Sequence, residues 1–109
     1  MRQFVSYTLR DKELSEEFLK EALMYYRNFG DVFLDIITND SSDKQKRVIN
    51  ELDNADKFIL IETKSVYDSE WVKLEIERAI EKGQAIEKIK LVDLKEIIEE
   101  AKKTVINIV

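Results

Sequence analysis

The chain alternates short apolar segments with longer segments whose apolar residues recur at helical spacing, and this alternation limits it to a few architectures. The clearest strand signal is the continuous apolar run at residues 58–61, which is typical of a strand covered on both faces. Shorter strands are expected at residues 4–5, 32–37 and 86–91. Strands that alternate with helices form right-handed βαβ units, so the pattern predicts a parallel sheet.

Local signals mark where the intervening helices begin and end. A short polar side chain caps a helix N-terminus, and glycine readily adopts the left-handed conformation that ends a helix. A polar loop is expected at residues 38–43. The expected helices, in chain order, are residues 12–29 with Asp11 as N-cap and Gly30 as terminator, a helix opened by a capping box of Ser42 and Gln45, and residues 69–82, which Gly83 ends.

The C-terminal segment fits two structures. Apolar residues from Leu94 to Ile108 keep helical spacing, whereas residues 104–109 are β-branched enough for a fifth strand. We expect one helix to the end, because a four-stranded sheet would then carry two helices on each face. The predicted fold is a single α/β domain over residues 1–109. It is a small doubly wound, flavodoxin-like three-layer sandwich with a parallel sheet of order 2-1-3-4, or 2-1-3-4-5 with the fifth strand.

Missing residue types remove several kinds of chemistry. The chain has 109 residues and contains no His, no Cys and no Pro. It therefore lacks the parts for a Ser-His-Asp relay, a thiol nucleophile or a disulfide, and we expect no metal site. A net charge of −5 argues against a nucleic-acid partner. No apolar run reaches the ~18 residues of a membrane span and no signal peptide is visible, so we expect a cytoplasmic protein without a membrane partner.

Both glycines are assigned to helix ends, which leaves none for a phosphate-binding loop. The sequence has neither a P-loop nor a GxGxxG fingerprint. The first and third strands are followed by Ser6-Tyr7 and Glu62-Thr63, which lack the acidic cluster and the acceptor Asp of a response regulator. Ligands of open parallel sheets bind beyond the carboxyl ends of the strands, so we expect the functional residues at that edge.

Among the acidic residues of the helix at 69–82, Glu75 lies beside the apolar stripe. At about 100° per residue, Glu75 falls on the flank of this stripe, one turn after Trp71. A carboxylate held partly buried beside an aromatic ring has a raised pKa and is a candidate functional group. The alternative is an exposed ion pair of Glu75 with Arg78 at i,i+3. The stripe consists of Val72, Ile76, Ala79 and Ile80.

Four blocks of the sequence, in order, resemble TIR (Toll/interleukin receptor) domains. The last block contains the SxWxxxE motif of that family. The resemblance covers residues 3 to about 92 and is to prokaryotic stand-alone TIR proteins of the Thoeris type, although the loop at residues 38–43 lacks the usual glycine and proline. The blocks are Phe4-Val5-Ser6-Tyr7 with Asp11, Gly30-Asp31-Val32-Phe33-Leu34-Asp35, Ala55-Asp56-Lys57-Phe58-Ile59-Leu60-Ile61, and Ser69-Glu70-Trp71-Val72-Lys73-Leu74-Glu75.

The resemblance implies an enzyme that cleaves the nicotinamide–ribose bond of NAD, either a glycohydrolase or an ADP-ribosyl cyclase. It gives the catalytic role to Glu75 and makes NAD a substrate rather than a cofactor. It further implies self-association through TIR surfaces. The product would be a signalling nucleotide that acts on a separate effector protein in antiphage defence.

The same resemblance implies five substrate-binding candidates near Glu75. Tyr7 either stacks on a ring or simply ends a strand, and Arg10 either meets the pyrophosphate or is solvated. Asp35 either orients a ligand or caps the following loop, and Trp71 is either structural or part of the binding site. Thr8 lies in the same loop as Tyr7 and Arg10.

Two other functions stay open at the level of sequence. One is a non-catalytic TIR interaction module in which Glu75 is incidental. The other is a nucleoside deoxyribosyltransferase-like enzyme, with the glutamate as nucleophile, which the chain resembles from Glu75-Ile76-Glu77-Arg78-Ala79 through Gly83. The Ser-x-Trp spacing and the Phe-Val-Ser-Tyr opening favour the TIR family.

Overall fold

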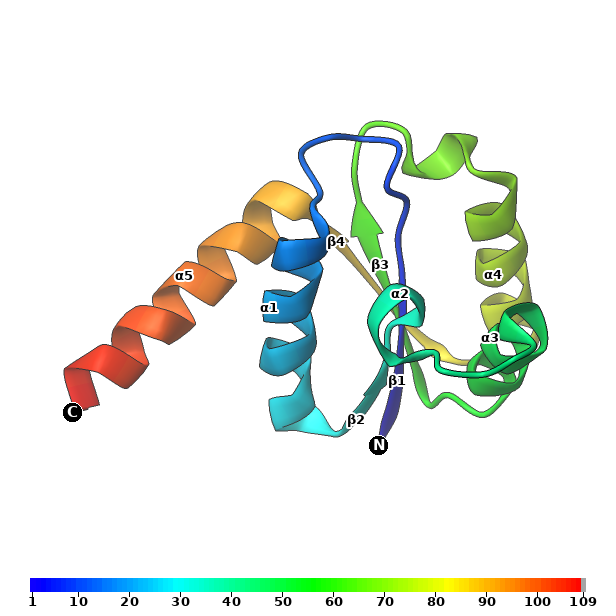
Figure 1. Ribbon diagram of the computed structural model, residues 1–109, viewed down its shortest axis with the longest axis horizontal. Helices are drawn as coiled ribbons and strands as arrows, with labels where there is room; N and C mark the ends of the chain where they lie inside the picture. The colour runs from blue at the N-terminus through cyan, green and yellow to red at the C-terminus, as the bar shows by residue number, and fades with distance from the viewer. Residues whose placement is uncertain (109) are drawn as a thin grey trace.

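The computed structural model describes residues 1–108, with side chains through residue 104 (Figure 1). In chain order the elements are β1 (Arg2–Ser6), α1 (Glu16–Tyr26), the 3-10 turn η1 (Arg27–Phe29), β2 (Asp31–Phe33), α2 (Asp35–Thr38), α3 (Lys44–Asp53), β3 (Lys57–Glu62), the 3-10 turn η2 (Val66–Asp68), α4 (Glu70–Glu81), β4 (Ala85–Lys90) and α5 (Leu91–Ile108).

The strands form one parallel sheet of order β2-β1-β3-β4, which confirms the predicted α/β fold and strand order. Figure 1 shows α1 and α5 on one face of this sheet and α3 and α4 on the other. The flavodoxin-like three-layer sandwich is therefore confirmed, with two helices on each face as expected.

Each face of the sheet has its own hydrophobic core, because successive side chains of a strand point to opposite faces. In β3, Ile59 and Ile61 pack with α1 and α5, whereas Phe58 and Leu60 pack with α3 and α4. Phe4 of β1 stacks on Phe58 with the ring centroids 5.8 Å apart. Both faces of β3 are thus covered, which is why its sequence is a continuous apolar run.

A single helix ends the described part of the chain. α5 runs without a break through residue 108, so the predicted C-terminal helix is confirmed there and no fifth strand forms; residue 109 lies outside the described residues. Leu91, Leu94 and Ile98 bury α5 against the α1 face of the sheet, and its far end diverges from the sheet in Figure 1. Within residues 1–108, no helix is long and apolar enough to cross a membrane.

The predicted start of α1 is wrong. Ser15 is the N-cap, because its Oγ accepts a hydrogen bond from the Phe18 N–H at 3.1 Å. Asp11 has a different role: its carboxylate accepts from the N–H and the hydroxyl of Ser65 at 2.8 and 2.9 Å. These bonds join the loop after β1 to the loop after β3, and the helix therefore begins only where the chain leaves this contact.

The capping box predicted for α3 does not form either. Asp43, rather than Ser42, is the N-cap, and its carboxylate accepts from the Lys46 N–H at 3.1 Å. The helix begins one residue later than a Ser42 cap would allow, so Gln45 is not at the position that bonds back to the cap. A carboxylate at this place also interacts favourably with the positive end of the helix dipole.

The strand predicted at residues 32–37 is correct only as far as Phe33. The next residues turn into the short helix α2, although they are rich in the β-branched residues that favour strands. The hydroxyl of Thr38 accepts from the Leu34 N–H at 2.9 Å and donates to the Leu34 carbonyl at 3.0 Å. This side chain closes the turn on itself and so ends the edge strand early.

The two glycines end helices in different ways. Gly83 follows α4 with φ of 67°, the left-handed conformation that was predicted for both glycines. Gly30 follows η1 with φ of 145° and ψ of −171°, a positive-φ conformation outside the left-handed helical region that residues with a side chain rarely adopt. A Cβ atom at Gly30 would collide with the backbone carbonyl of Met1, so glycine is required there by the close approach of the first strand.

Candidate functional site

Glu75 lies on α4 and faces the carboxyl end of β1. Ser69 caps the helix by accepting from the Val72 N–H at 3.3 Å, which places Glu75 in the second turn. Glu75 is only 5% exposed. Ser6, the last residue of β1, donates its hydroxyl hydrogen to Oε1 of Glu75 at 2.8 Å. The sheet therefore brings together two polar side chains that are far apart in the sequence.

The surroundings of Glu75 oppose its ionisation. Burial raises the pKa of Glu75 to about 7, and the nearby negative charge of Asp35 adds to the rise, whereas Ser6 and Trp71 lower it. A carboxyl group with a pKa near 7 changes charge in the range where most enzymes work. A strongly perturbed carboxyl at the ligand-binding edge of a parallel sheet is a typical functional group.

Arg78 does not pair with Glu75, which removes the structural alternative for this glutamate. Its guanidinium binds both carboxylate oxygens of Asp53 on α3, with Nη2 2.8 Å from Oδ2. The two bonds are parallel, in the bidentate arrangement that suits arginine and a carboxylate. Arg78 thus joins α4 to α3, and its guanidinium does not pair with the carboxyl group of Glu75.

A small pocket lies beside the site, between α2, α3 and α4. Its volume is about 220 Å³, and Asp35 and Trp71 line it together with Lys44, Gln45 and Val48. Trp71 is 39% exposed, so its indole forms part of the surface and does not belong to either hydrophobic core. Asp35 is half-buried at the start of α2 and accepts from the side-chain amide of Asn39 at 2.7 Å.

Tyr7 connects β1 to the acidic side of the pocket. Its hydroxyl oxygen accepts from the Ile36 N–H of α2 at 3.1 Å. Burial raises the pKa of Tyr7 to about 12, a rise that the Ile36 bond opposes and the charges of Asp35 and Glu75 increase. Tyr7 is therefore neutral near pH 7 and lies close enough to both carboxylates to be affected by their charge.

The structure does not bring Thr8 and Arg10 into contact with Glu75 or Asp35. Thr8 is buried, and its hydroxyl accepts from the Arg10 N–H at 3.4 Å. Arg10 is exposed and donates from Nη1 to the Asp68 carbonyl of η2 at 3.1 Å. Arg10 thus holds the loop after β1 against the turn before α4, whereas the bond of Thr8 stays within its own loop.

The family of the chain follows from its sequence taken as a whole. A family model described as the TIR-like domain of Thoeris protein ThsB matches residues 4–103. The chain belongs to this TIR-like family. The resemblance to prokaryotic stand-alone TIR proteins is thereby confirmed. A search of curated proteins finds no match.

Two residues of this TIR-like site were missed as candidates. Ser6 stands in the Phe-Val-Ser-Tyr block at the end of a predicted strand, and this position was a signal that it faces the ligand edge. Asn39 is buried behind Asp35, in a segment whose sequence is typical of an exposed polar loop. The segment of residues 35–43 was expected at the ligand edge, but nothing in it marks Asn39 in particular, because the partners of Asn39 depend on the unexpected helix α2.

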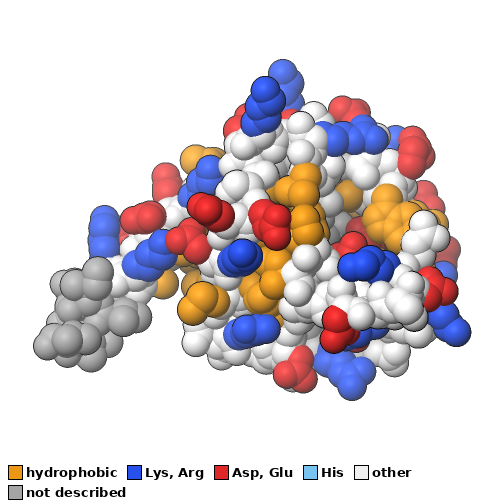
Figure 2. Space-filling view, viewed as in Figure 1, with side chains coloured by type: hydrophobic (Ala, Val, Ile, Leu, Met, Phe, Trp, Pro, Cys, Tyr) orange, Lys and Arg blue, Asp and Glu red, His pale blue; other side chains and the backbone are white. Residues whose placement is uncertain are grey.

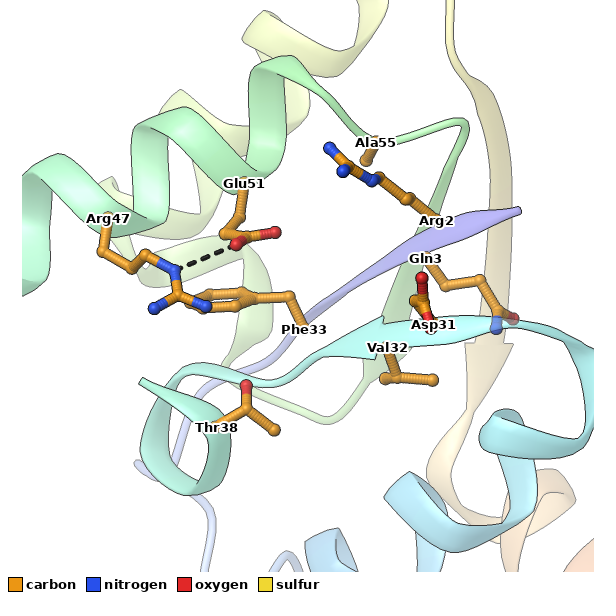
Figure 3. Close-up of a pocket in the computed structure, with 9 residues that line it drawn as sticks. All are labelled: Arg2, Gln3, Asp31, Val32, Phe33, Thr38, Arg47, Glu51 and Ala55. Atoms are coloured by element: carbon orange, nitrogen blue, oxygen red, sulfur yellow. Dashed lines mark hydrogen bonds and ion pairs between the residues drawn. The ribbon is translucent and has the colours of Figure 1, made fainter. Parts of the chain in front are cut away.

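The hollow in Figure 3 is a different feature of the domain. It measures about 250 Å³ and lies where β2 meets α3, with Arg2 and Asp31 from the amino ends of the strands in its lining. Arg47 pairs with Glu51 at 2.9 Å and lies over the ring of Phe33, so these two charged groups of the hollow already have each other as partners. Among the residues that the structure describes, no group of three or more acidic side chains could hold a metal ion.

Proposed function

We propose that this TIR-like domain cleaves the nicotinamide–ribose bond of NAD, with Glu75 as the catalytic carboxylate. The observation that carries the proposal is the burial of Glu75 beside Ser6, at the carboxyl edge of the sheet, with a pKa of about 7. Membership of the TIR-like family supports it, since the glutamate stands in the SxWxxxE motif.

The chemistry suits a site without His, Cys or metal ligands. The bond between C1′ of the ribose and the pyridinium nitrogen breaks, and both electrons leave with nicotinamide, so no general acid is needed. The ribose becomes oxocarbenium-like, and a nearby carboxylate stabilises its positive charge. Water then adds to C1′ and releases a proton, which gives ADP-ribose. A cyclised product forms when an adenine nitrogen attacks C1′ in place of water.

Each neighbour of Glu75 has a place in this proposal. Ser6 orients the carboxylate by donating to Oε1. Asp35 and Trp71 line the adjacent pocket, where an anion and an aromatic ring would favour a cationic pyridinium. We assign Tyr7 to the support of α2 and of this acidic wall. Arg10 and Thr8 are assigned to the more distant end of the ligand, with Arg10 toward the pyrophosphate.

A second candidate is a TIR interaction module without catalysis. The pocket of about 220 Å³ is smaller than the ~300–1,000 Å³ typical of ligand pockets, so this pocket by itself offers little enclosed space for a dinucleotide. Leu74 of α4 is 43% exposed, and Figure 2 shows a band of hydrophobic side chains along one face of the domain. Both features fit self-association, which would either enlarge the site or be the function itself.

The test is to incubate the protein with NAD over a wide range of protein concentration and to separate the products by chromatography. Release of nicotinamide by the parent protein and its loss in Glu75→Ala are expected. Glu77→Ala is the matched control, because Glu77 is an exposed glutamate on the same helix. The accompanying product, linear or cyclic ADP-ribose, distinguishes a glycohydrolase from a cyclase and provides the nucleotide to test on a separate effector.

Intact NAD at concentrations where sedimentation shows self-association would overturn the catalytic proposal and favour the interaction module. Loss of cleavage in Glu77→Ala to the same extent as in Glu75→Ala would show that the effect is not specific to the buried carboxyl. Circular dichroism of each variant checks that the fold is retained.

A further inference from the structure

A buried amide connects α2 to the segment that precedes α3. Asn39 directly follows α2 and is 6% exposed. Its Nδ2 donates to Oδ1 of Asp35 at 2.7 Å and to the Lys44 carbonyl at 3.1 Å, and its Oδ1 accepts from the Ser41 N–H at 3.1 Å. Both amide hydrogens and the amide oxygen are used, so the side chain has one orientation.

The shortest of these bonds fixes the carboxylate of Asp35. Oδ1 of Asp35 is bound to Asn39, while Oδ2 has no hydrogen-bond or ion-pair partner in the part of the chain whose side chains are described. Asp35 also lines the pocket beside Trp71, and its charge acts on Glu75 and on Tyr7. The site therefore contains a second carboxylate, whose placement depends on a residue that does not itself line the pocket.

We propose that Asn39 is a positioning residue, which holds the Asp35 carboxylate beside Glu75 with one oxygen bound and the other available to a ligand. This deepens the proposed cleavage of NAD and rests on it for the identity of the ligand. Two carboxylates at one site oppose each other's ionisation in the empty protein and jointly stabilise a positive charge that develops between them. Asn39 sets this arrangement by geometry, because it is itself neutral.

Among the groups around Glu75, Asp35 is the charged group whose effect on the pKa of Glu75 is to be tested. Ser6 from β1 and Trp71 from α4 are neutral, and Tyr7 is neutral near pH 7 because its pKa is raised to about 12. Lys44 of α3 lines the same pocket, and its ammonium group donates to the Asn39 carbonyl at 3.2 Å. Glu16 of α1 acts on Tyr7. Asp35 is the group whose negative charge raises the pKa of Glu75.

Asn39 also closes the loop before α3, so loss of stability alone would not distinguish a positioning role from a structural one. The two roles differ in what happens to Glu75. A structural residue changes the stability of the fold, whereas a positioning residue changes the titration of Glu75, and does so only while residue 35 carries a charge. Asp35→Asn removes that charge and keeps an oxygen that accepts from Asn39, so the geometry is retained.

The experiment is an NMR titration of the side-chain carboxyl carbon of Glu75 in the parent protein, Asn39→Ala, Asp35→Asn and the double variant. We expect Asp35→Asn to lower the pKa of Glu75. Asn39→Ala is expected to lower it by about half a pH unit, because Asp35 then turns toward solvent. In the double variant, removal of Asn39 should add no further shift to that of Asp35→Asn.

Asn50→Ala is the matched control, because Asn50 is an exposed asparagine of α3, and it should leave the titration unchanged. If Asn39→Ala does not fold, Asn39→Ser replaces it, since a serine hydroxyl is too short to reach Asp35. An unchanged pKa of Glu75 in the folded Asn39 variant would overturn the proposal. The proposal would also be overturned if removal of Asn39 shifted the pKa of Glu75 equally in the parent protein and in Asp35→Asn.

NAD cleavage by the same proteins is measured separately, so that the two proposals fail in different ways. We expect Asn39→Ala to lower kcat by roughly tenfold and to move the acid limb of its pH profile to lower pH, with the Glu75 titration. Coupled titrations with NAD left intact by the parent protein would overturn the proposed reaction and leave the positioning role. If the parent protein cleaves NAD but the pKa of Glu75 does not respond to Asn39, the positioning role is overturned and the proposed reaction stands.

Discussion

Glu75 and Asp53 are two carboxylates on the α3–α4 face of the sheet, and the fold treats them in opposite ways. Arg78 binds Asp53 through two hydrogen bonds and holds the pKa of that carboxyl below its ordinary value. Glu75 lies three residues before the same arginine, yet it is buried next to Ser6 and has a pKa raised to about 7. Asp53 joins two helices through Arg78, whereas Glu75 has no bond to that arginine.

The difference between the two carboxylates shows how Glu75 is kept from pairing with the nearby guanidinium of Arg78. An Arg78–Glu75 pair would keep the carboxylate ionised, but it would also place a cation where the pyridinium of the proposed substrate would bind. Asp53 removes that cation by binding it bidentately on the neighbouring helix. The ion pair therefore contributes to the site through what it withdraws from Glu75, as well as through the attachment of α4 to α3.

The largest expected effect separates the two carboxylates by activity. Glu75→Gln keeps the shape of the side chain and its bond to Ser6 but removes the anion, so NAD cleavage should fall by about 10²-fold or more. Asp53→Asn should cleave NAD at close to the parental rate, because Asp53 does not line the pocket and an asparagine oxygen still accepts a hydrogen bond from Arg78. The measurement is the rate of nicotinamide release at saturating NAD. Equal losses in the two variants would mean that Glu75 has no special role.

The second expected effect is a dependence of stability on pH that comes from Glu75. Its pKa is about 7 in the folded protein against an ordinary value of 4.5, so between these values the folded state retains a proton that the unfolded state has lost. The unfolded state binds fewer protons, and the free energy of unfolding therefore falls as pH rises from about 4.5 to 7. The full cost, about 3 kcal/mol, is reached above pH 7.

Urea denaturation of the parent protein and of Glu75→Gln at pH 5 and pH 8 measures this cost. The amide variant should lack this part of the pH dependence, so its stability relative to the parent should increase between the two pH values. A constant difference between the proteins would show that Glu75 has an ordinary pKa. Asp11 and Asp53 do not interfere, because their pKa values are lowered and they titrate below this range.

The sequence contained enough information for the strand order and for the buried position of Glu75, but not for the partner of Arg78. The flank position of Glu75 depends on helical periodicity, which a single sequence displays directly. The strand order followed from the alternation of strands and helices and from the doubly wound fold that this alternation indicates. The Arg78–Asp53 pair joins residues 25 apart, and Glu75 meets Ser6 across 69 positions. The i,i+3 spacing of Glu75 and Arg78 indicated an ion pair between them, but in the fold Arg78 pairs with Asp53 instead.

The helix caps and α2 failed for a related reason. Several residues able to cap a helix precede α1, and tertiary contacts decide among them: Asp11 binds Ser65, so Ser15 is left as the cap. α2 is stabilised by the Thr38 side chain on Leu34, against the strand preference of its residues. Asn39 was missed with it, because an amide behind an unexpected helix leaves no mark in the sequence.

Removing the hydroxyl of Ser6 tests the polar support of Glu75 and should have a smaller effect than removing the carboxylate itself. Ser6 lowers the pKa of Glu75, so Ser6→Ala should raise it and move the acid limb of NAD cleavage above about pH 7. We expect kcat at neutral pH to fall roughly tenfold, and stability to fall by about 1 kcal/mol. A rate profile identical to that of the parent would show that Ser6 does not orient the carboxylate.

The smallest expected effect comes from breaking the ion pair between Arg78 and Asp53. Arg78→Met removes the guanidinium from Asp53 and should lower stability at pH 7 by less than Ser6→Ala does, because water screens a pair that is only partly covered. The pKa of Asp53 is lowered in the folded protein, so its contribution is present above the ordinary value of 3.8 and is lost as pH falls below it. Urea denaturation at pH 7 and pH 3 should therefore show a difference from the parent that shrinks in acid.

The control for this ion pair is Lys73→Met, which removes an exposed i,i+3 pair with Glu70 on the same helix and should change stability less than Arg78→Met. The Glu75 titration in Arg78→Met then decides how separate the two carboxylates are. Because Asp53 holds the guanidinium away from Glu75, the pKa of Glu75 should stay near 7. A rise in that pKa would mean that the arginine stabilises both anions, and that the separation between them is weaker than their contacts indicate.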